Sequence, residues 1–136
     1  MKPTAFLDTN ILLRHLLQDD PGQSPKASAF LKTVEEGSVV VATTDTVVFE
    51  TVFLLERRYR RPRNQIRMAL LPILELPGIV LSGKRRLNKV FDLYVDLGLP
   101  FADAHHAVQM SRMGLTRIVS FDEDFDEVPG ITRVRL

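Results

Sequence analysis

Short apolar runs rich in β-branched residues alternate along this chain with longer stretches of helical periodicity. The runs expected to form strands are residues 4–7, 39–42, 79–81, 117–121 and 131–134. The intervening helices are expected at residues 11–17, 25–36, 45–60, 63–75, 84–97 and 101–113. Parallel strands need long crossover connections, and helices are the usual ones. The alternation therefore predicts an α/β fold in which helices cover both faces of a parallel sheet.

Length and composition are those of one small domain. A chain of 136 residues, 45% hydrophobic and 26% charged, is typical of a single globular domain, expected here to span residues 1–136. The absence of cysteine excludes disulfides, thiol catalysis and thiolate metal sites. No stretch approaches the roughly 20 apolar residues of a membrane span, and Asp8 comes too early for a signal peptide. We therefore expect a cytoplasmic protein without a membrane segment.

The charges are segregated along the chain although they nearly cancel. The net charge is +1, which by itself indicates no partner. Six arginines fall between Arg57 and Arg67. A second basic group consists of Lys84, Arg85, Arg86 and Lys89. The acidic group near the end of the sequence consists of Asp122, Glu123, Asp124, Asp126 and Glu127.

Two acids follow directly on expected strands. Asp8 comes after the run that ends at Leu7, and Asp122 comes after the run that ends at Phe121. Functional sites of parallel sheets lie beyond the carboxyl ends of the strands. If the two strands are neighbours, the carboxylates are close, and one takes up a proton unless a cation lies between them. The alternative is that Asp8 caps a helix and Asp122 belongs to a solvated acidic loop.

Two further acids lie on expected helices. Glu50 lies within the apolar segment 47–55, where burial of an unpaired carboxylate is costly. Val47 stands where a capping box would need Ser or Thr, which leaves a functional role or an ion pair with an arginine. Asp103 lies at a helix start among small and apolar residues. There it can either join a site or simply favour the helix dipole.

Together, Asp8, Glu50, Asp103 and Asp122 form a set of oxygen donors without the Cys or paired-His spacing that zinc favours. Such hard ligands suit Mg²⁺ or Mn²⁺. A carboxylate site of this kind suits metal-assisted hydrolysis of a phosphodiester.

These motifs occur in an order that resembles the PIN-domain ribonucleases, and most closely the VapC-type toxins of prokaryotic toxin–antitoxin pairs. The resemblance lies in Asp8-Thr9-Asn10 after the first strand, Glu50 in the helix after the second, Asp103 before a small and apolar helix start, and Ser120-Phe121-Asp122-Glu123-Asp124-Phe125 after the fourth strand. The order and spacing of these elements cover essentially the whole chain.

The resemblance implies a three-layer α/β/α sandwich with a five-stranded parallel sheet in the order 3-2-1-4-5. It implies an endoribonuclease that depends on Mg²⁺ or Mn²⁺, forms a homodimer and is inhibited by a small antitoxin protein. The four acids would be its catalytic metal ligands.

The residues that the resemblance places around these ligands are Thr9, Asn10, Ser120 and Asp124. Asp124 and Asp126 are also alternatives to Asp122 as the fourth acid. His105 and His106 are expected to be surface or packing residues.

The first basic group has two interpretations. Cations at a helix end favour the dipole, which accounts for Arg57 and its neighbours. Arg61, Arg63 and Arg67 fit this explanation less well and are candidates for contact with RNA phosphates.

Two other functions compete with a nuclease. A phosphatase or phosphoacceptor domain is disfavoured because Asn10 stands where a second Asp is needed and no acid follows the third strand. A non-catalytic RNA- or protein-binding module on the same fold is disfavoured because all four acids are present.

Overall fold

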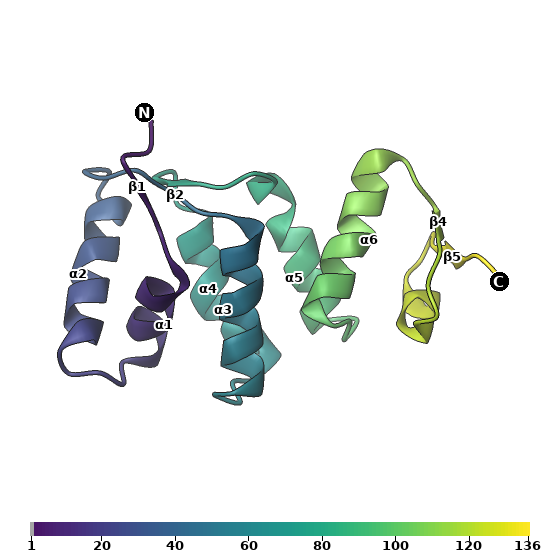
Figure 1. Cartoon of the computed structure of the whole chain (residues 1–136), viewed down its shortest axis with the longest axis horizontal. Helices are drawn as coiled ribbons and strands as arrows, with labels where there is room; N and C mark the ends of the chain where they lie inside the picture. The colour runs from purple at the N-terminus through teal and green to yellow at the C-terminus, as the bar shows by residue number, and fades with distance from the viewer. Residues whose placement is uncertain (1) are drawn as a thin grey trace. The chain divides into compact units, whose positions relative to one another are not determined.

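The structure of the protein is a computed structural model that describes residues 2–136 (Figure 1). The chain forms two compact units. The first ends at Lys84, and the second runs from Arg85 to Leu136. Each unit is described by itself, and the single domain expected for residues 1–136 stays a prediction.

The first unit contains a three-stranded parallel sheet in the order β1-β2-β3, accompanied by helices (Figure 1). Its elements are β1 (Ala5–Phe6), α1 (Thr9–Leu17), α2 (Gln23–Glu35), β2 (Val41–Ala42), α3 (Asp45–Arg57), α4 (Arg63–Leu74) and β3 (Ile79–Val80). In the ladder Ala5 is opposite Val41, and Val41 is opposite Ile79. The strands therefore run in parallel as the sequence predicts, and their carboxyl ends lie at one edge.

Side-chain hydrogen bonds fix the connections of this unit. The Thr43 hydroxyl, buried beyond β2, donates to the carbonyl oxygen of Leu7 at 3.0 Å and so ties the ends of β1 and β2 together. The Asp20 Oδ1 accepts from the backbone amides of Gly22 and Gln23 at 2.9 and 2.8 Å, which starts α2. Lys84 Nζ donates to the carbonyl oxygens of Leu76 and, at 2.7 Å, of Ile79, and thereby holds the connection around β3.

The second unit contains two helices and a two-stranded parallel sheet. Its elements are α5 (Leu87–Val95), α6 (Phe101–Met113), β4 (Arg117–Ile118), the 3-10 helix η2 (Glu123–Glu127) and β5 (Thr132–Arg133), and the short 3-10 helix η1 (Lys84–Arg86) lies at the boundary. Its core contains three rings that meet edge to face: the Phe101 centroid lies 5.0 Å from that of Phe91 and 5.2 Å from that of Tyr94. Gly114 ends α6 at a φ of 73°.

The expected five-stranded sheet is wrong in one respect. The order 3-2-1 is found in one sheet and the pair 4-5 in another, so the structure shows three and two strands rather than five in one sheet. The fourth strand ends at Ile118 instead of Phe121, because the Ser120 side chain bonds to the backbone just beyond it and favours a turn over a ladder. Val119 and Phe121 are consequently 68% and 87% exposed.

The first strand also differs from the expectation of a buried run. Ala5 and Phe6 are exposed, and only Leu7, which follows β1, is buried. Among residues 2–136, no helix has the length and apolar character needed to cross a membrane.

The close approach of Gly78 to α2 leads to a prediction. A Cβ at Gly78 would lie 2.9 Å from both Cγ1 and the carbonyl oxygen of Val34, and the backbone cannot easily move aside. We expect Gly78→Ala to lower the free energy of unfolding by about 1–3 kcal/mol in urea denaturation. In the control, Gly22→Ala, the new methyl group meets Asp20 Oδ1 at an ordinary 3.5 Å, so stability should change by less than about 1 kcal/mol. Equal effects of the two substitutions would contradict this account.

Candidate metal centre

Three carboxylates come together in the second unit. One oxygen from each of Asp103, Asp122 and Asp124 lies within 4.8 Å of the others. Asp103 is in the first turn of α6, whereas Asp122 is the N-cap of η2 and Asp124 lies in the first turn of η2. The backbone therefore brings together acids that are about 20 positions apart in the sequence.

Two hydrogen bonds hold the turn after β4 in place. The Ser120 Oγ accepts from the backbone amide of Asp122 at 2.9 Å, and the Asp122 Oδ1 accepts from the backbone amide of Asp124 at 2.9 Å. Ser120 thus acts on the backbone that carries Asp122. The acidic pair is positioned by the chain itself, before any ligand is bound.

The three acids differ in proton affinity. Partial burial raises the pKa of Asp103, and the neighbouring carboxylate of Asp122 raises it further, while the nearby His106 lowers it. The Asp124 amide is the main cause of the lowered pKa of Asp122. Repulsion from Asp122 raises the pKa of Asp124. A proton shared within the cluster therefore resides on Asp103 or Asp124 rather than on Asp122.

The donor set fits a divalent cation. In the part of the chain that the structure describes, no lysine or arginine forms an ion pair with Asp103, Asp122 or Asp124. Three carboxylates that form no ion pair with a lysine or arginine suit a hard ion that binds oxygen. Asp126 is different, because Arg133 donates to both of its oxygens at 2.8 and 2.9 Å. Of the three alternatives in this loop, Asp122 and Asp124 face Asp103, and Asp126 is engaged elsewhere.

Asp8, Thr9 and Asn10 lie in the first unit, at the carboxyl end of β1. Asp8 is exposed and precedes α1, and its side chain forms no capping hydrogen bond. Thr9 is 3% exposed, and its hydroxyl has no partner among the described residues. Asn10 is exposed. A carboxylate free of intramolecular partners beside a buried unsatisfied hydroxyl is a local arrangement open to a ligand, but membership of Asp8 in one site with Asp103 stays a prediction.

The environment expected for Glu50 is wrong. Glu50 is exposed, and Phe53, almost one turn further along α3, is 62% exposed. The buried face of α3 consists of Val47, Val48, Thr51, Val52 and Leu55. The apolar segment 47–55 therefore packs through one face of the helix and leaves Glu50 outside it. The argument from burial therefore fails for Glu50, whose place in the site rests on the resemblance alone.

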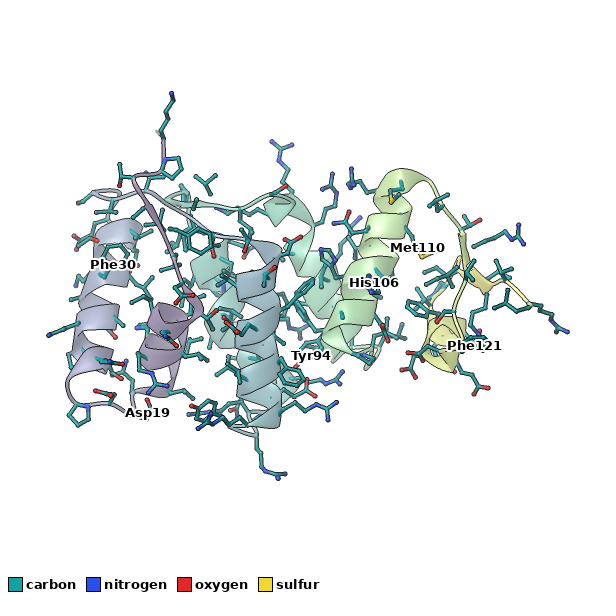
Figure 2. The ribbon with its side chains drawn as sticks, in the orientation of Figure 1. Asp19, Phe30, Tyr94, His106, Met110 and Phe121 are labelled. Carbon is teal, nitrogen blue, oxygen red and sulfur yellow. The ribbon has the colours of Figure 1, made fainter. Side chains whose placement is uncertain are left out.

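Sequence reasoning underrated two residues near Asp103. Asp124 was placed in a supporting role, yet it contributes an oxygen to the cluster itself. His106 was expected to be a surface or packing residue, and it is exposed on α6 (Figure 2). Its charge nevertheless acts on Asp103. The i, i+3 spacing of Asp103 and His106 on one helix is the signal that could have found this pair.

The candidate RNA-binding arginines occupy different surroundings. Arg63 Nη2 lies 3.5 Å from Glu56 Oε2, whereas the exposed Arg61 forms no ion pair with a described residue. Arg67 is half-buried. None of these observations tests contact with RNA.

The raised pKa of Asp103 leads to a pH-dependent prediction. A carboxyl group with a raised pKa in the folded state costs stability once it is ionised, and this cost disappears as the pH falls to the ordinary value of 3.8. Asp103→Asn should therefore raise the melting temperature of the metal-free protein by a few degrees at neutral pH, with a smaller gain below pH 4.

Asp126→Asn is the matched control for this prediction. The Arg133 guanidinium lowers the pKa of Asp126, so the ionised form stabilises the fold at neutral pH. Its replacement should lower the melting temperature, and the loss should shrink as acid protonates Asp126 in the parent protein. The same sign for both variants in thermal unfolding would count against the electrostatics described above.

The comparisons with known proteins agree with this arrangement. The model of the PIN domain family matches residues 5–131, which is nearly the whole chain. The comparison with curated proteins gives no match. PIN domains are usually nucleases and generally bind divalent metals, in keeping with the acidic cluster. The chain belongs to the PIN-domain family.

Proposed function

We propose that this protein is an endoribonuclease that hydrolyses RNA phosphodiester bonds with Mg²⁺ or Mn²⁺, and that it is the toxin of a toxin–antitoxin pair. The observation that carries the nuclease is the group of three carboxylates within 4.8 Å in a chain of the PIN-domain family. The RNA substrate, the antitoxin and a homodimer follow from the resemblance to VapC-type toxins. Phe53 on α3 and Met68 on α4 are large apolar side chains exposed in the first unit, and their exposure supports a protein partner.

The proposed site joins Asp8 and Glu50 to Asp103 and Asp122. Asp8 follows a parallel strand, and Glu50 lies in the helix after the neighbouring strand, so both belong near the carboxyl edge of that sheet. Asp122 follows a parallel strand of the second sheet. Neither Asp8 nor Glu50 has an ion pair within residues 2–136, which leaves both carboxylates available.

The residues of the chain have separate tasks in this mechanism. Asp8, Glu50, Asp103 and Asp122 would hold the cation, with Asp124 beside them and with Ser120 fixing the backbone of the loop. When bound, a divalent cation lowers the pKa of water and neutralises charge that develops on the phosphate. Because its pKa is raised, Asp103 can hold a proton, and it would have to be deprotonated to act as a metal ligand.

Cleavage of RNA is the first expectation. The purified protein should cut single-stranded RNA in the presence of Mn²⁺ and stop when EDTA is added. Asp8→Asn, Glu50→Gln, Asp103→Asn and Asp122→Asn should each reduce the rate by more than about 100-fold, because loss of a ligand exceeds the 10–100-fold cost of an outer partner. Glu36→Gln and Asp126→Asn, which remove acids outside the proposed site, should retain the parent rate.

Metal binding distinguishes a site that includes Asp8 and Glu50 from a site made only by the three clustered acids of the second unit. At a Mn²⁺ concentration about 100 times the dissociation constant, binding should stabilise the protein by about 2.7 kcal/mol, seen as a higher melting temperature. If the four acids converge, Asp8→Asn and Glu50→Gln weaken this effect as Asp103→Asn does. An undiminished response in the first two variants would confine the site to the second unit. RNA binding without cleavage by the parent protein would favour the non-catalytic module.

The arginine group has its own test. If Arg61 and Arg63 contact phosphates, the double variant Arg61→Ala/Arg63→Ala should bind RNA more weakly and with a salt slope reduced by about 1.4, since each contact to single-stranded RNA contributes about 0.7. An unaltered slope in fluorescence anisotropy would rule out this role. Unaltered RNA binding with a changed molecular mass in solution would assign the pair to protein assembly.

A further inference from the structure

The second unit contains a pocket at the end of α6, and none of the three clustered acids lines it. Its volume is about 620 Å³, which lies in the range of small-molecule sites. The walls come from the beginning of α5, the last turns of α6, the connection to β4 and residues 128–131. All of these segments belong to the unit that runs from Arg85 to Leu136.

The pocket lining has an aliphatic part, which we call the floor. Leu93 on α5, Val108 on α6 and Leu115 after α6 line it, together with apolar residues that precede β5. Leu115 is 49% exposed, so the floor is accessible from outside. The lining contains no aromatic ring. An apolar ligand group can therefore contact this floor through van der Waals packing with aliphatic side chains, without aromatic stacking.

The pocket lining also has a basic part, which we call the rim. Arg86, Lys89 and Arg112 line it, against a single acid, Asp92. The side chains of Arg86 and Lys89 form no ion pair or hydrogen bond with any residue between 2 and 136. The Arg112 Nε donates to the Gln109 side-chain oxygen at 2.9 Å, which orients the guanidinium group.

Folding does not account for the two cations of α5. Arg86 is the N-cap of this helix and Lys89 lies in its first turn, where the helix dipole disfavours positive charge. No acid in that turn compensates them. Cations that oppose the dipole and lack partners indicate an anionic ligand.

The remaining polar lining matches one class of anion. Ser111 and Thr116 provide exposed hydroxyl groups, and Gly114 and Gly130 leave open space where a side chain would begin. Arginine, lysine, serine and threonine are the side chains that contact phosphate and sugar in protein–nucleic acid complexes. An aliphatic floor beside such donors accommodates a base or ribose next to a bound phosphate.

Helix α6 connects this pocket to the acidic cluster. Asp103 lies in its first turn and Arg112 in its last, so the nine-residue separation corresponds to a rise of about 14 Å. Between them, the His105 Nε2 lies 3.3 Å from the Gln109 Nε2, and Gln109 bonds to Arg112. In Figure 2, the labelled His106 and Met110 lie on this helix, about one turn apart.

We propose that this pocket anchors one nucleotide of the RNA substrate, its phosphate on Arg86, Lys89 and Arg112 and its base or ribose on the aliphatic floor. This inference rests on the proposed function. Because α6 is rigid, an anchored nucleotide sets which phosphate of the strand reaches the acids. The pocket would thus determine the position of cleavage relative to the anchored nucleotide, whereas the acids perform the reaction.

The test compares Arg86→Ala/Lys89→Ala with Lys26→Ala/Lys32→Ala, which removes two exposed lysines without partners from α2. With EDTA present to stop cleavage, anisotropy of a fluorescent single-stranded RNA is measured over a range of salt. The pocket variant should bind more weakly, with a salt slope reduced by about 1.4, and the control variant should match the parent. The charge-conserving Lys89→Arg should keep the parent slope.

Cleavage supplies a second measurement. With Mn²⁺ and end-labelled RNA, the pocket variant should raise KM and spread the cut positions, while kcat changes less than twofold. An unchanged salt slope together with unchanged cut positions would overturn the proposed nucleotide anchor without contradicting the proposed nuclease function. The same result is expected if the pocket binds an acidic protein segment. Pocket-dependent RNA binding by a parent protein that never cleaves would sustain the anchor and refute the nuclease.

Discussion

Parallel strand pairing is the constraint on which the rest of this structure depends. A parallel neighbour cannot be reached by a tight turn, so each strand of the first unit is followed by helical crossovers before the next is laid down. The carboxyl ends of all three strands in this unit then lie at the same edge of their sheet. Asp8 owes its place to this geometry. Asp122 likewise comes after the carboxyl end of a parallel strand, β4. Among the described residues, that strand pairs only with β5.

Sequence patterns predicted the elements well where local chemistry decides them. Pro62 before α4 lacks an amide hydrogen, and Gly114 after α6 adopts a positive φ, so each fixes a helix boundary, and both boundaries are found as expected. Strand lengths were overestimated. The apolar run 117–121 reads as one strand, yet the hydroxyl of Ser120 diverts the backbone after Ile118. Hydrophobic periodicity does not reveal where a side-chain hydrogen bond to the backbone competes with the hydrogen bonds between two strands.

The positions of the acidic residues were likewise predicted well in some cases and poorly in others. Asp103 and Asp122 were expected to be close, and their oxygens are, because one starts a helix and the other follows a strand in the same unit. Glu50 was expected to be buried because its neighbours in sequence are apolar, but burial depends on which face of α3 has a partner. Asp124 joins the cluster through the hydrogen bond from its own amide, a contact that depends on backbone conformation rather than on residue type.

The division of the acids between the two units has a consequence for synthesis on the ribosome. The unit that ends at Lys84 contains the whole three-stranded sheet, and all of it is synthesised before the second unit. At about 5–20 residues per second, the following segment takes roughly 3–10 s to appear. Asp103, Asp122 and Asp124 all belong to that segment. A nascent chain that has reached Lys84 therefore lacks the cluster of carboxylates, and the proposed nuclease is inactive until synthesis has passed Asp124.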